Sequence, residues 1–391
     1  MRQMHHWAAM LFIAAMMIHL LRVFFTGAHR KPRELNWVIG CLLLLLGTLE
    51  GFTGYSLPDD LLSGTGIRAA DGFIKSIPVV GTYVSFFLFG GEFPGDSIIP
   101  RLYTIHVLLI PGLLLALIAA HMLLLVYHKH TQWPGPGRTE ENVVGFPMLP
   151  VYAAKAGGFF FVVFGITAVM GGLMSINPVW KFGPYDPTKV TAGSQPDWYM
   201  GWPDGALRIM PGIESHFWGS TWSWNVFLPI IVLPGLLFTV LLLLPFVEAW
   251  ITGDKREHHL LQRPRNAPTR TATMVALMTL YASFWMAGGN DLIAIKLHAS
   301  INQITYILRA ASSSSRSSPS SSPAGSASAC SVTTTRRCST ATRPASSCGH
   351  RRAPTTRSTS RFPRRRPTRS PFATAAPGSS SRRPVPTGTA Y

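Results

Sequence analysis

The sequence predicts an all-α polytopic membrane protein, a bundle of about six to seven transmembrane helices joined by short surface helices. Two observations predict this fold class. Apolar residues make up 47% of the 391 residues and charged residues only 13%, and the mean hydropathy is positive. Apolar runs of roughly 20 residues, the length that crosses a bilayer, recur along most of the chain. A soluble enzyme is therefore excluded.

The expected spans follow one another with loops of unequal length. They cover residues 5–26, 37–56, 102–127, 154–175, 224–250 and 270–288, and a seventh begins near 299. Proline within several spans is tolerable, because neighbouring helices can satisfy the freed backbone groups. Gly and Pro interrupt short apolar stretches in the connection 57–100, which indicates surface helices outside the membrane core.

Basic residues after the first, third and fifth spans predict the orientation. By the positive-inside rule, the loops that carry them face the cytoplasm. The loops 57–100 and 176–222 mix acidic residues with fewer basic ones, so we expect them on the outer side. The basic residues are Arg22, Arg30, Lys31 and Arg33, then Lys129 and Arg138, then Lys255, Arg256, Arg263 and Arg265.

The formal net charge of +18 is concentrated at the carboxyl end. Residues 310–391 hold 14 Arg and no Lys, Asp or Glu, so only +4 remains for residues 1–309. The composition of this Ser/Arg/Pro-rich segment predicts disorder. Cys41 lies in an apolar run and the other three cysteines lie in the segment, so neither a disulfide framework nor a thiolate metal site is indicated.

Four of the histidines inside expected spans, where an unpaired imidazole would be costly, form two spaced pairs. His5 and His19 are 14 residues apart in the first span, and His106 and His121 are 15 apart in the third. At about 100° and 1.5 Å per residue, each pair projects from roughly one face of its helix, about 21–22 Å apart. Two such helices can build two stacked sites with one imidazole from each helix. Bis-imidazole ligation of two haem irons fits this pattern.

Other interpretations of these residues stay open. The histidines could be hydrogen-bonded core residues or a proton path, although the matched spacing favours ligation. Gly40 and Gly54 of the second span are again 14 apart, and a missing side chain permits the close approach of a flat ligand. Glycine also occurs where membrane helices simply pack together. His6 points elsewhere on the helix and is interpreted as structural.

Further motifs accompany the histidines. These are Arg2 with His5, His19 with Arg22, Trp37 to Gly40, Gly54-Tyr55-Ser56-Leu57-Pro58, Ser76-Ile77-Pro78 to Gly81-Thr82, Pro196-Asp197-Trp198-Tyr199, and Ala206-Leu207-Arg208 to Pro211. With these motifs, nearly all of residues 1–309 resembles the cytochrome b subunit of quinol–cytochrome c reductase (cytochrome bc) complexes. The 15-residue spacing, the Pro-Asp-Trp-Tyr variant and the run 259–265 resemble the actinobacterial, menaquinol-oxidising branch.

The resemblance implies two non-covalent b-type haems, a low-potential one near the outer side and a high-potential one near the cytoplasm. Their ligands would be His5 with His106 and His19 with His121, respectively. Nearby groups implied by the family are Arg2 and Arg22, which would pair with haem propionates, and Gly40 and Gly54, which would lie against the haems.

Residues 196–199 correspond to the family's Pro-Glu-Trp-Tyr signature at the quinol-oxidation site, with Asp197 in place of Glu. A carboxylate there can accept a quinol proton, so Asp197 and Tyr199 are the expected catalytic residues. Tyr55, Pro196 and Trp198 are the expected quinone-binding residues. Without the resemblance, Asp197 would be interpreted as an ordinary outer-loop acid.

The expected inner quinone site departs from the family pattern. Lys155 is followed by Ala156, where the family has an acid. His128 is a candidate quinone ligand, but a solvated basic end at residues 128–130 is the favoured interpretation. Asp204 stands where relatives often carry an aromatic residue, and no role is assigned to it.

The function implied is menaquinol oxidation at the outer side. One electron would pass to a Rieske iron–sulfur subunit and the other through the two haems to an inner quinone, coupled to proton translocation. Further expected partners are a cytochrome c subunit, a terminal oxidase in a supercomplex, a second copy of the complex and the lipid membrane, but no nucleic acid. The expected location is the bacterial cell membrane. A non-redox polytopic membrane protein and a non-functional fragment are the alternatives.

The expected regions are 1–150, the diheme-binding part, 151–309, the part with the quinol-oxidation loop, and 310–391, the tail. The family has one helix before the helix that carries His5, so the resemblance predicts a truncated N-terminus. With suitable codon choices, a frame shifted by two bases over Arg309–Ala345 encodes an apolar span with a charged end. We therefore expect a frameshift near Ala310. A genuine basic tail that binds nucleic acid or anionic lipid is the alternative.

Overall fold

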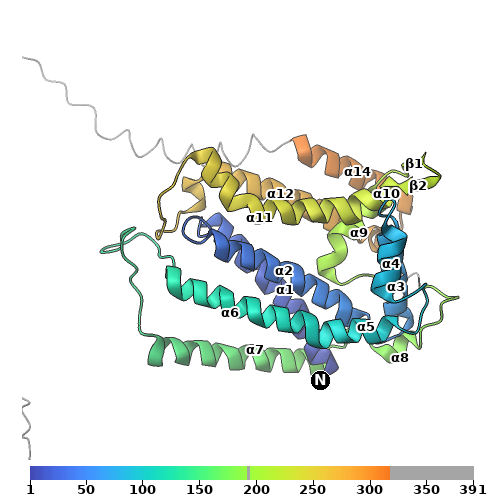
Figure 1. Ribbon diagram of the computed structural model, residues 1–391, viewed down its shortest axis with the longest axis horizontal. Helices are drawn as coiled ribbons and strands as arrows, with labels where there is room; N and C mark the ends of the chain where they lie inside the picture. The colour runs from blue at the N-terminus through green and yellow to red at the C-terminus, as the bar shows by residue number, and fades with distance from the viewer. Residues whose placement is uncertain (192–193, 318–391) are drawn as a thin grey trace, which may run out of the picture. The chain divides into compact units, whose positions relative to one another are not determined.

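Long helices run side by side in the computed structural model, which describes residues 1–191 and 194–317 (Figure 1). Several spans consist of consecutive helical pieces, in which a π-helical turn precedes the main helix. In order, the long elements are α1 (Arg2–Phe25), α2 (Glu34–Tyr55), α5 (Ile98–Thr104) with η1 (Ile105–Leu109) and α6 (Ile110–His128), η2 (Met148–Tyr152) with α7 (Ala153–Leu173), α10 (Trp224–Phe227) with η4 (Leu228–Val232) and α11 (Leu233–Thr252), α12 (Pro268–Ala287), α13 (Asn290–Leu297) and α14 (Ile301–Ser317).

The expected membrane helix bundle is confirmed. Within the described residues, five helices are long and apolar enough to cross a bilayer, and α12 with α13 makes a sixth if this pair, bent by 63°, counts as one span. The span expected from residue 299 is not among them. Its place is taken by α14, an amphipathic helix whose last turns are rich in serine. Residues 318–391, most of the expected tail, lie outside the described residues.

Helix α2 lies at the centre of the bundle and contacts α1, α6 and α11. The core at the amino-terminal half of α2 contains Phe24, Trp37, Cys41, Leu241 and Met274. The indole of Trp37 donates a hydrogen bond to the Leu241 carbonyl at 2.6 Å, so even the polar atom of this core is satisfied. By contrast, α7 contacts α1 and leaves a run of exposed aromatic residues, as expected for a surface that faces lipid.

A second core joins α9 (Gly201–Ile209), α12 and α14. Its buried residues include Trp202, Ala206 and Phe284. A Cβ at Gly205 would overlap the backbone carbonyl of Phe284, so glycine permits the close approach of α9 and α12. Through this contact, the bundle fixes the segment that immediately follows Asp197.

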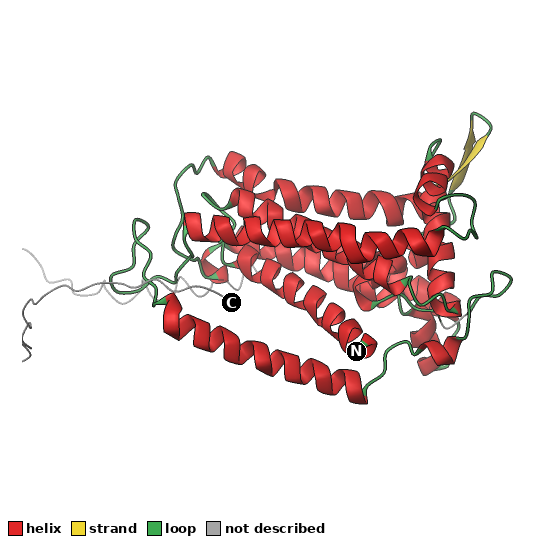
Figure 2. Cartoon of the chain, turned by 60° about the horizontal axis from the view of Figure 1, so that its bottom comes forward, coloured by secondary structure: helices red, strands yellow, loops and turns green. Residues whose placement is uncertain are grey.

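Short elements cover the end of the bundle that we assign to the outer side. They are α3 (Leu61–Lys75), α4 (Gly81–Phe89), α8 (Val179–Phe182), η3 (Trp198–Met200), and strands β1 (Glu214–Phe217) and β2 (Ser220–Ser223). Helices α3 and α4 are the short helices expected in residues 57–100. The antiparallel hairpin, yellow in Figure 2, was not expected. Positive φ angles at Trp218 and Gly219 form its two-residue turn.

Arg33 connects three segments at the opposite end of the bundle. Its buried guanidinium donates hydrogen bonds to the carbonyls of His258 (2.8 Å), Lys129 (3.0 Å) and His128 (3.1 Å). The Glu140 carboxylate accepts the backbone N–H of Leu260 at 2.8 Å. The three basic loops predicted to share one side of the membrane therefore meet at one end of the bundle.

Candidate functional site

The four intramembrane histidines form two facing pairs. His5 of α1 faces His106 of η1 with 6.1 Å between ring centroids, and His19 of α1 faces His121 of α6 with 6.5 Å. The rings of both pairs are close to perpendicular, with interplanar angles of 85° and 74°. The structure thus brings together, in the expected combination, residues that the sequence places in different helices.

A π-helical turn explains the unequal spacing of the two pairs. Residues 105–109 form η1, so one residue more than in a regular α-helix fits between His106 and His121. The 15-residue spacing on this span therefore matches the 14-residue spacing of His5 and His19 on α1. This shift in register lets His106 face His5 while His121 faces His19.

The geometry of both pairs fits the haem groups that the sequence suggests. The separations of 6.1 and 6.5 Å between ring centroids would leave room for one metal ion between the imidazoles of each pair, at about 2 Å from a nitrogen of either ring. A Cβ at Gly54 would overlap Cε1 of His106, and one at Gly40 would lie 3.5 Å from Cε1 of His121. Each pair thus has a glycine beside it.

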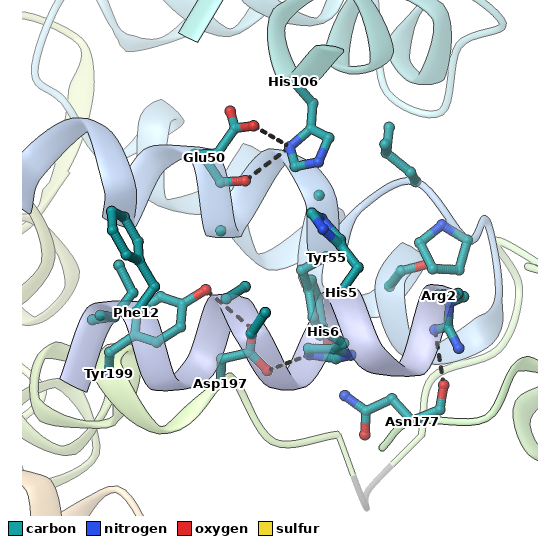
Figure 3. A pocket seen from close by; sticks show the side chains of 18 of the residues that line it. Arg2, His5, His6, Phe12, Glu50, Tyr55, His106, Asn177, Asp197 and Tyr199 are labelled. Atoms are coloured by element: carbon teal, nitrogen blue, oxygen red, sulfur yellow. Dashed lines mark hydrogen bonds and ion pairs between the residues drawn. The ribbon is translucent and has the colours of Figure 1, made fainter. Parts of the chain in front are cut away.

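A cavity of about 660 Å³ opens beside the outer pair (Figure 3). This volume suits an organic ligand. Residues from distant segments line it, and seven of them were predicted site residues: Arg2, His5, Gly54, Tyr55, His106, Asp197 and Tyr199. Arg2 lines the cavity, and its guanidinium donates a hydrogen bond to the Asn177 carbonyl at 2.9 Å.

Both carboxylate oxygens of Asp197 have partners in this cavity. Oδ2 accepts a hydrogen bond from the Tyr199 hydroxyl at 3.1 Å, and Oδ1 lies 3.5 Å from Nε2 of His6. Only 8% of the Asp197 side chain is exposed. Burial raises the pKa of Tyr199, and the negative charge of Asp197 raises it further, so this phenol is a hydrogen-bond donor at neutral pH.

The local backbone explains why Asp197 lies here. Tyr199 lies in the turn η3 and is buried against Gly51 of α2, where a Cβ would overlap the tyrosine hydroxyl. Gln195, on the other side of Asp197, donates a hydrogen bond to Asp291 of α13 at 2.7 Å. The segment is thus held from both sides, and Asp197 lies between its two attachments.

Asp204, to which the sequence assigned no role, is an ion-pair partner of Arg208 with 2.8 Å between Oδ2 and Nε. Arg208 also pairs with Asp291 at 3.0 Å. Burial raises the pKa of Asp204, and the neighbouring Arg208 opposes that rise. The contacts of Asp204 are therefore those of a packed ion pair next to the cavity.

Other predicted site residues lie apart from this cavity. Pro196 is exposed, and the Trp198 carbonyl accepts a hydrogen bond from the Trp285 indole at 2.9 Å; neither residue lines the cavity. Arg22 is exposed in the last turn of α1, one turn beyond His19. At the expected inner quinone site, Lys155 lies over the Phe146 ring and His128 packs against Tyr127.

Two ionisable residues that were not predicted as site residues lie in the cavity beside predicted ones. His6, interpreted as structural, lines the cavity beside Asp197. Glu50, which the analysis passed over, lines it beside His106. Glu50 had a readable signal, because an ionisable side chain inside an apolar span marks a functional position. His6 lies inside an apolar span too, but its partner Asp197 is distant in sequence, so the contact between them could not be predicted.

Comparison with known proteins assigns this architecture to a family. Residues 10–184 match the family model described as cytochrome b (N-terminal)/b6/petB. The cytochrome bc1 complex cytochrome b subunit of Streptomyces coelicolor is 59% identical over 310 residues, which are 79% of this chain and 57% of that protein. Residues 10–184 thus match the cytochrome b family, and the aligned part of the chain is similar to a cytochrome b subunit.

Other relatives give the same result. The cytochrome bc1 complex cytochrome b subunit of Mycobacterium tuberculosis is 54% identical over 309 residues, which cover 79% of this chain and 56% of that protein. A solved structure titled Hyperthermophilic respiratory Complex III superposes with a TM-score of 0.57 at 22% identity, covering 80% of this chain and 78% of that one, and shares the fold. The chain spans little more than half the length of the curated relatives it matches. It is a multi-pass protein of the bacterial cell membrane.

Proposed function

We propose that the chain is the diheme cytochrome b subunit of a respiratory quinol–cytochrome c reductase that oxidises menaquinol at the outer side of the membrane. The observation that supports this proposal is that the imidazoles of four histidines face each other in two pairs. One of these pairs lines the same cavity as Asp197. A packing role for the histidines gives no reason for two matched pairs with glycines beside them.

Four histidines would hold the two b-type haems. His5 and His106 would bind the outer haem and His19 and His121 the inner one, with Gly54 and Gly40 leaving room for the rings of His106 and His121. When bound, the haems supply one-electron transfer across the membrane. The arginines Arg2 and Arg22 lie one turn from His5 and His19, respectively, where each could pair with a propionate.

Asp197 would act as the general base in quinol oxidation. Its carboxylate faces the cavity, is almost fully buried and is oriented by Tyr199 and His6. A carboxylate within hydrogen-bond reach of a quinol hydroxyl can accept its proton as the electrons leave. Tyr55 lines the cavity and would contact the substrate ring, whereas Pro196 and Trp198 would shape the segment that carries Asp197.

The partners follow from the complex named in the relatives. We propose that the chain works with a Rieske iron–sulfur subunit and a cytochrome c subunit, in a dimeric complex that can join a terminal oxidase. High identity to actinobacterial subunits supports menaquinol as the substrate. Reduction of quinone near the cytoplasmic end would take up protons there and couple electron transfer to proton translocation.

The replacement Asp197→Asn tests this function. It keeps the shape of the side chain and removes the base, so quinol oxidation by the assembled complex is expected to fall about 100-fold or more. Both haems should remain visible in the optical spectrum. Asp186→Asn, in the exposed outer loop, is the matched control and should leave the rate unchanged. An unchanged rate in Asp197→Asn would remove Asp197 from the mechanism.

A further inference from the structure

The two histidine pairs differ at one position of α2. Each pair has a glycine of α2 beside it, Gly40 at the inner pair and Gly54 at the outer pair. Four residues before each glycine, one helical turn away, stands Asn36 at the inner site and Glu50 at the outer site. The 14-residue repeat of α2 therefore presents a neutral amide to one site and a carboxyl group to the other.

At the outer site, two oxygens of Glu50 lie within hydrogen-bond distance of Nδ1 of His106 (Figure 3). The backbone carbonyl of Glu50 lies 3.0 Å from that nitrogen and its side-chain Oε1 lies 3.1 Å from it. The Thr53 hydroxyl, also 3.1 Å away, donates its own hydrogen to the Glu50 carbonyl. The acceptors around Nδ1 favour the tautomer with hydrogen on Nδ1, which leaves Nε2 free as a ligand.

The second oxygen of Glu50 is also informative. Oε2 is buried and has no hydrogen-bond partner within the described residues. A buried carboxylate oxygen without a partner is costly, so such an arrangement persists only where something else compensates for it. Thus the outer site holds an acid whose contacts are directed at a histidine and at the cavity, and among the described residues no Lys or Arg side chain pairs with it.

The inner site has the same backbone arrangement without the acid. The Asn36 backbone lies near His121, but Nδ1 of His121 makes no hydrogen bond of good geometry in the described part of the chain. The side-chain Oδ1 of Asn36 is buried and also lacks a partner there. An uncharged amide at this position cannot strengthen the imidazole as a carboxylate does.

We propose that Glu50 is a positioning residue that lowers the reduction potential of the outer haem relative to the inner one. The inference rests on the proposed haem function. A carboxylate that accepts the hydrogen bond of a ligating imidazole makes the ligand more basic, and this stabilises the oxidised metal. Because Asn36 gives the inner site no such acid, the difference between these two side chains favours electron transfer from the outer site to the inner one.

Redox titration of the purified complex tests this assignment, with optical detection of both haems. Glu50→Gln keeps the size of the side chain and removes the carboxylate. We expect it to raise the midpoint potential of the outer haem by about 59 mV, which is a tenfold change in a one-electron equilibrium. Glu34→Gln, an acid-to-amide change on the same helix with no contact to either histidine pair, should leave both potentials unchanged.

The reciprocal variant Asn36→Asp introduces an acid at the inner site and should lower the midpoint potential of the inner haem. Asn36→Asp still tests the inference if the complex that carries Glu50→Gln fails to assemble. An unchanged or lowered outer potential in Glu50→Gln, or an unchanged inner potential in Asn36→Asp, would overturn the inference. Absence of b-type haem from the wild-type complex would instead refute the proposed function, so the two failures are distinguishable.

Discussion

His106 faces His5 with 6.1 Å between ring centroids, and the π-helical turn η1 places it there. Without that turn, His106 and His121 would project about 60° apart around a regular helix. Helix α1 shows no such interruption, and its two histidines are 14 residues apart. The additional residue in η1 thus allows the histidines of the two spans to face each other in both pairs.

Gly54→Val should remove the outer haem. The new Cβ would overlap the His106 ring, and neither the ring nor α2 can move without breaking the hydrogen bonds at Nδ1. The reduced-minus-oxidised spectrum of the variant should keep the inner component only. Gly112→Val, in α6, is the control, because nothing lies within 4 Å of its new Cβ. Retention of both components in Gly54→Val would show that this glycine serves helix packing alone.

Arg33→Met should destabilise the cytoplasmic end of the bundle. Loss of the guanidinium leaves the buried carbonyl of His258 and the partly buried carbonyl of Lys129 without this donor, at about 1–3 kcal/mol for each buried group left unsatisfied. We expect a total loss of at least about 3 kcal/mol, measured by thermal unfolding in detergent. Lys31→Met removes an exposed charge two residues away and should have little effect. Equal melting temperatures for the two variants would contradict the connecting role of Arg33.

The stability of this end should also fall at acidic pH. Burial lowers the pKa of His258 below its ordinary value of 6.5, and the positive charge of Arg30 lowers it further. Below about pH 6.5 the unfolded chain therefore binds more protons than the folded one, so folding stability decreases as the pH falls. Melting temperatures between pH 8 and pH 5 should decline less in His258→Gln than in wild type, whereas the exposed His298→Asn should follow wild type. A parallel decline in all three proteins would exclude His258 as the cause.

Much of the fold was readable because membrane helices are long and apolar. The histidine spacing predicted the two pairs, since periodicity along a helix determines which residues share a face. The orientation of His6 toward Asp197 was not readable, because the loop that carries Asp197 is fixed by contacts such as Gln195 with Asp291. The hairpin 214–223 escaped notice because a hairpin this short has little periodicity to detect.

The central claim, two b-type haems held by the two histidine pairs, is tested most directly by a dithionite-reduced minus oxidised spectrum. The spectrum is recorded with the haem content per chain, for wild type and for His121→Leu, after circular dichroism has shown that both are helical. We predict two haems and two b-type components in wild type, and loss of the inner component with retention of the outer one in His121→Leu. A folded wild-type protein without b-type absorption, or a variant spectrum identical to wild type, would contradict the account.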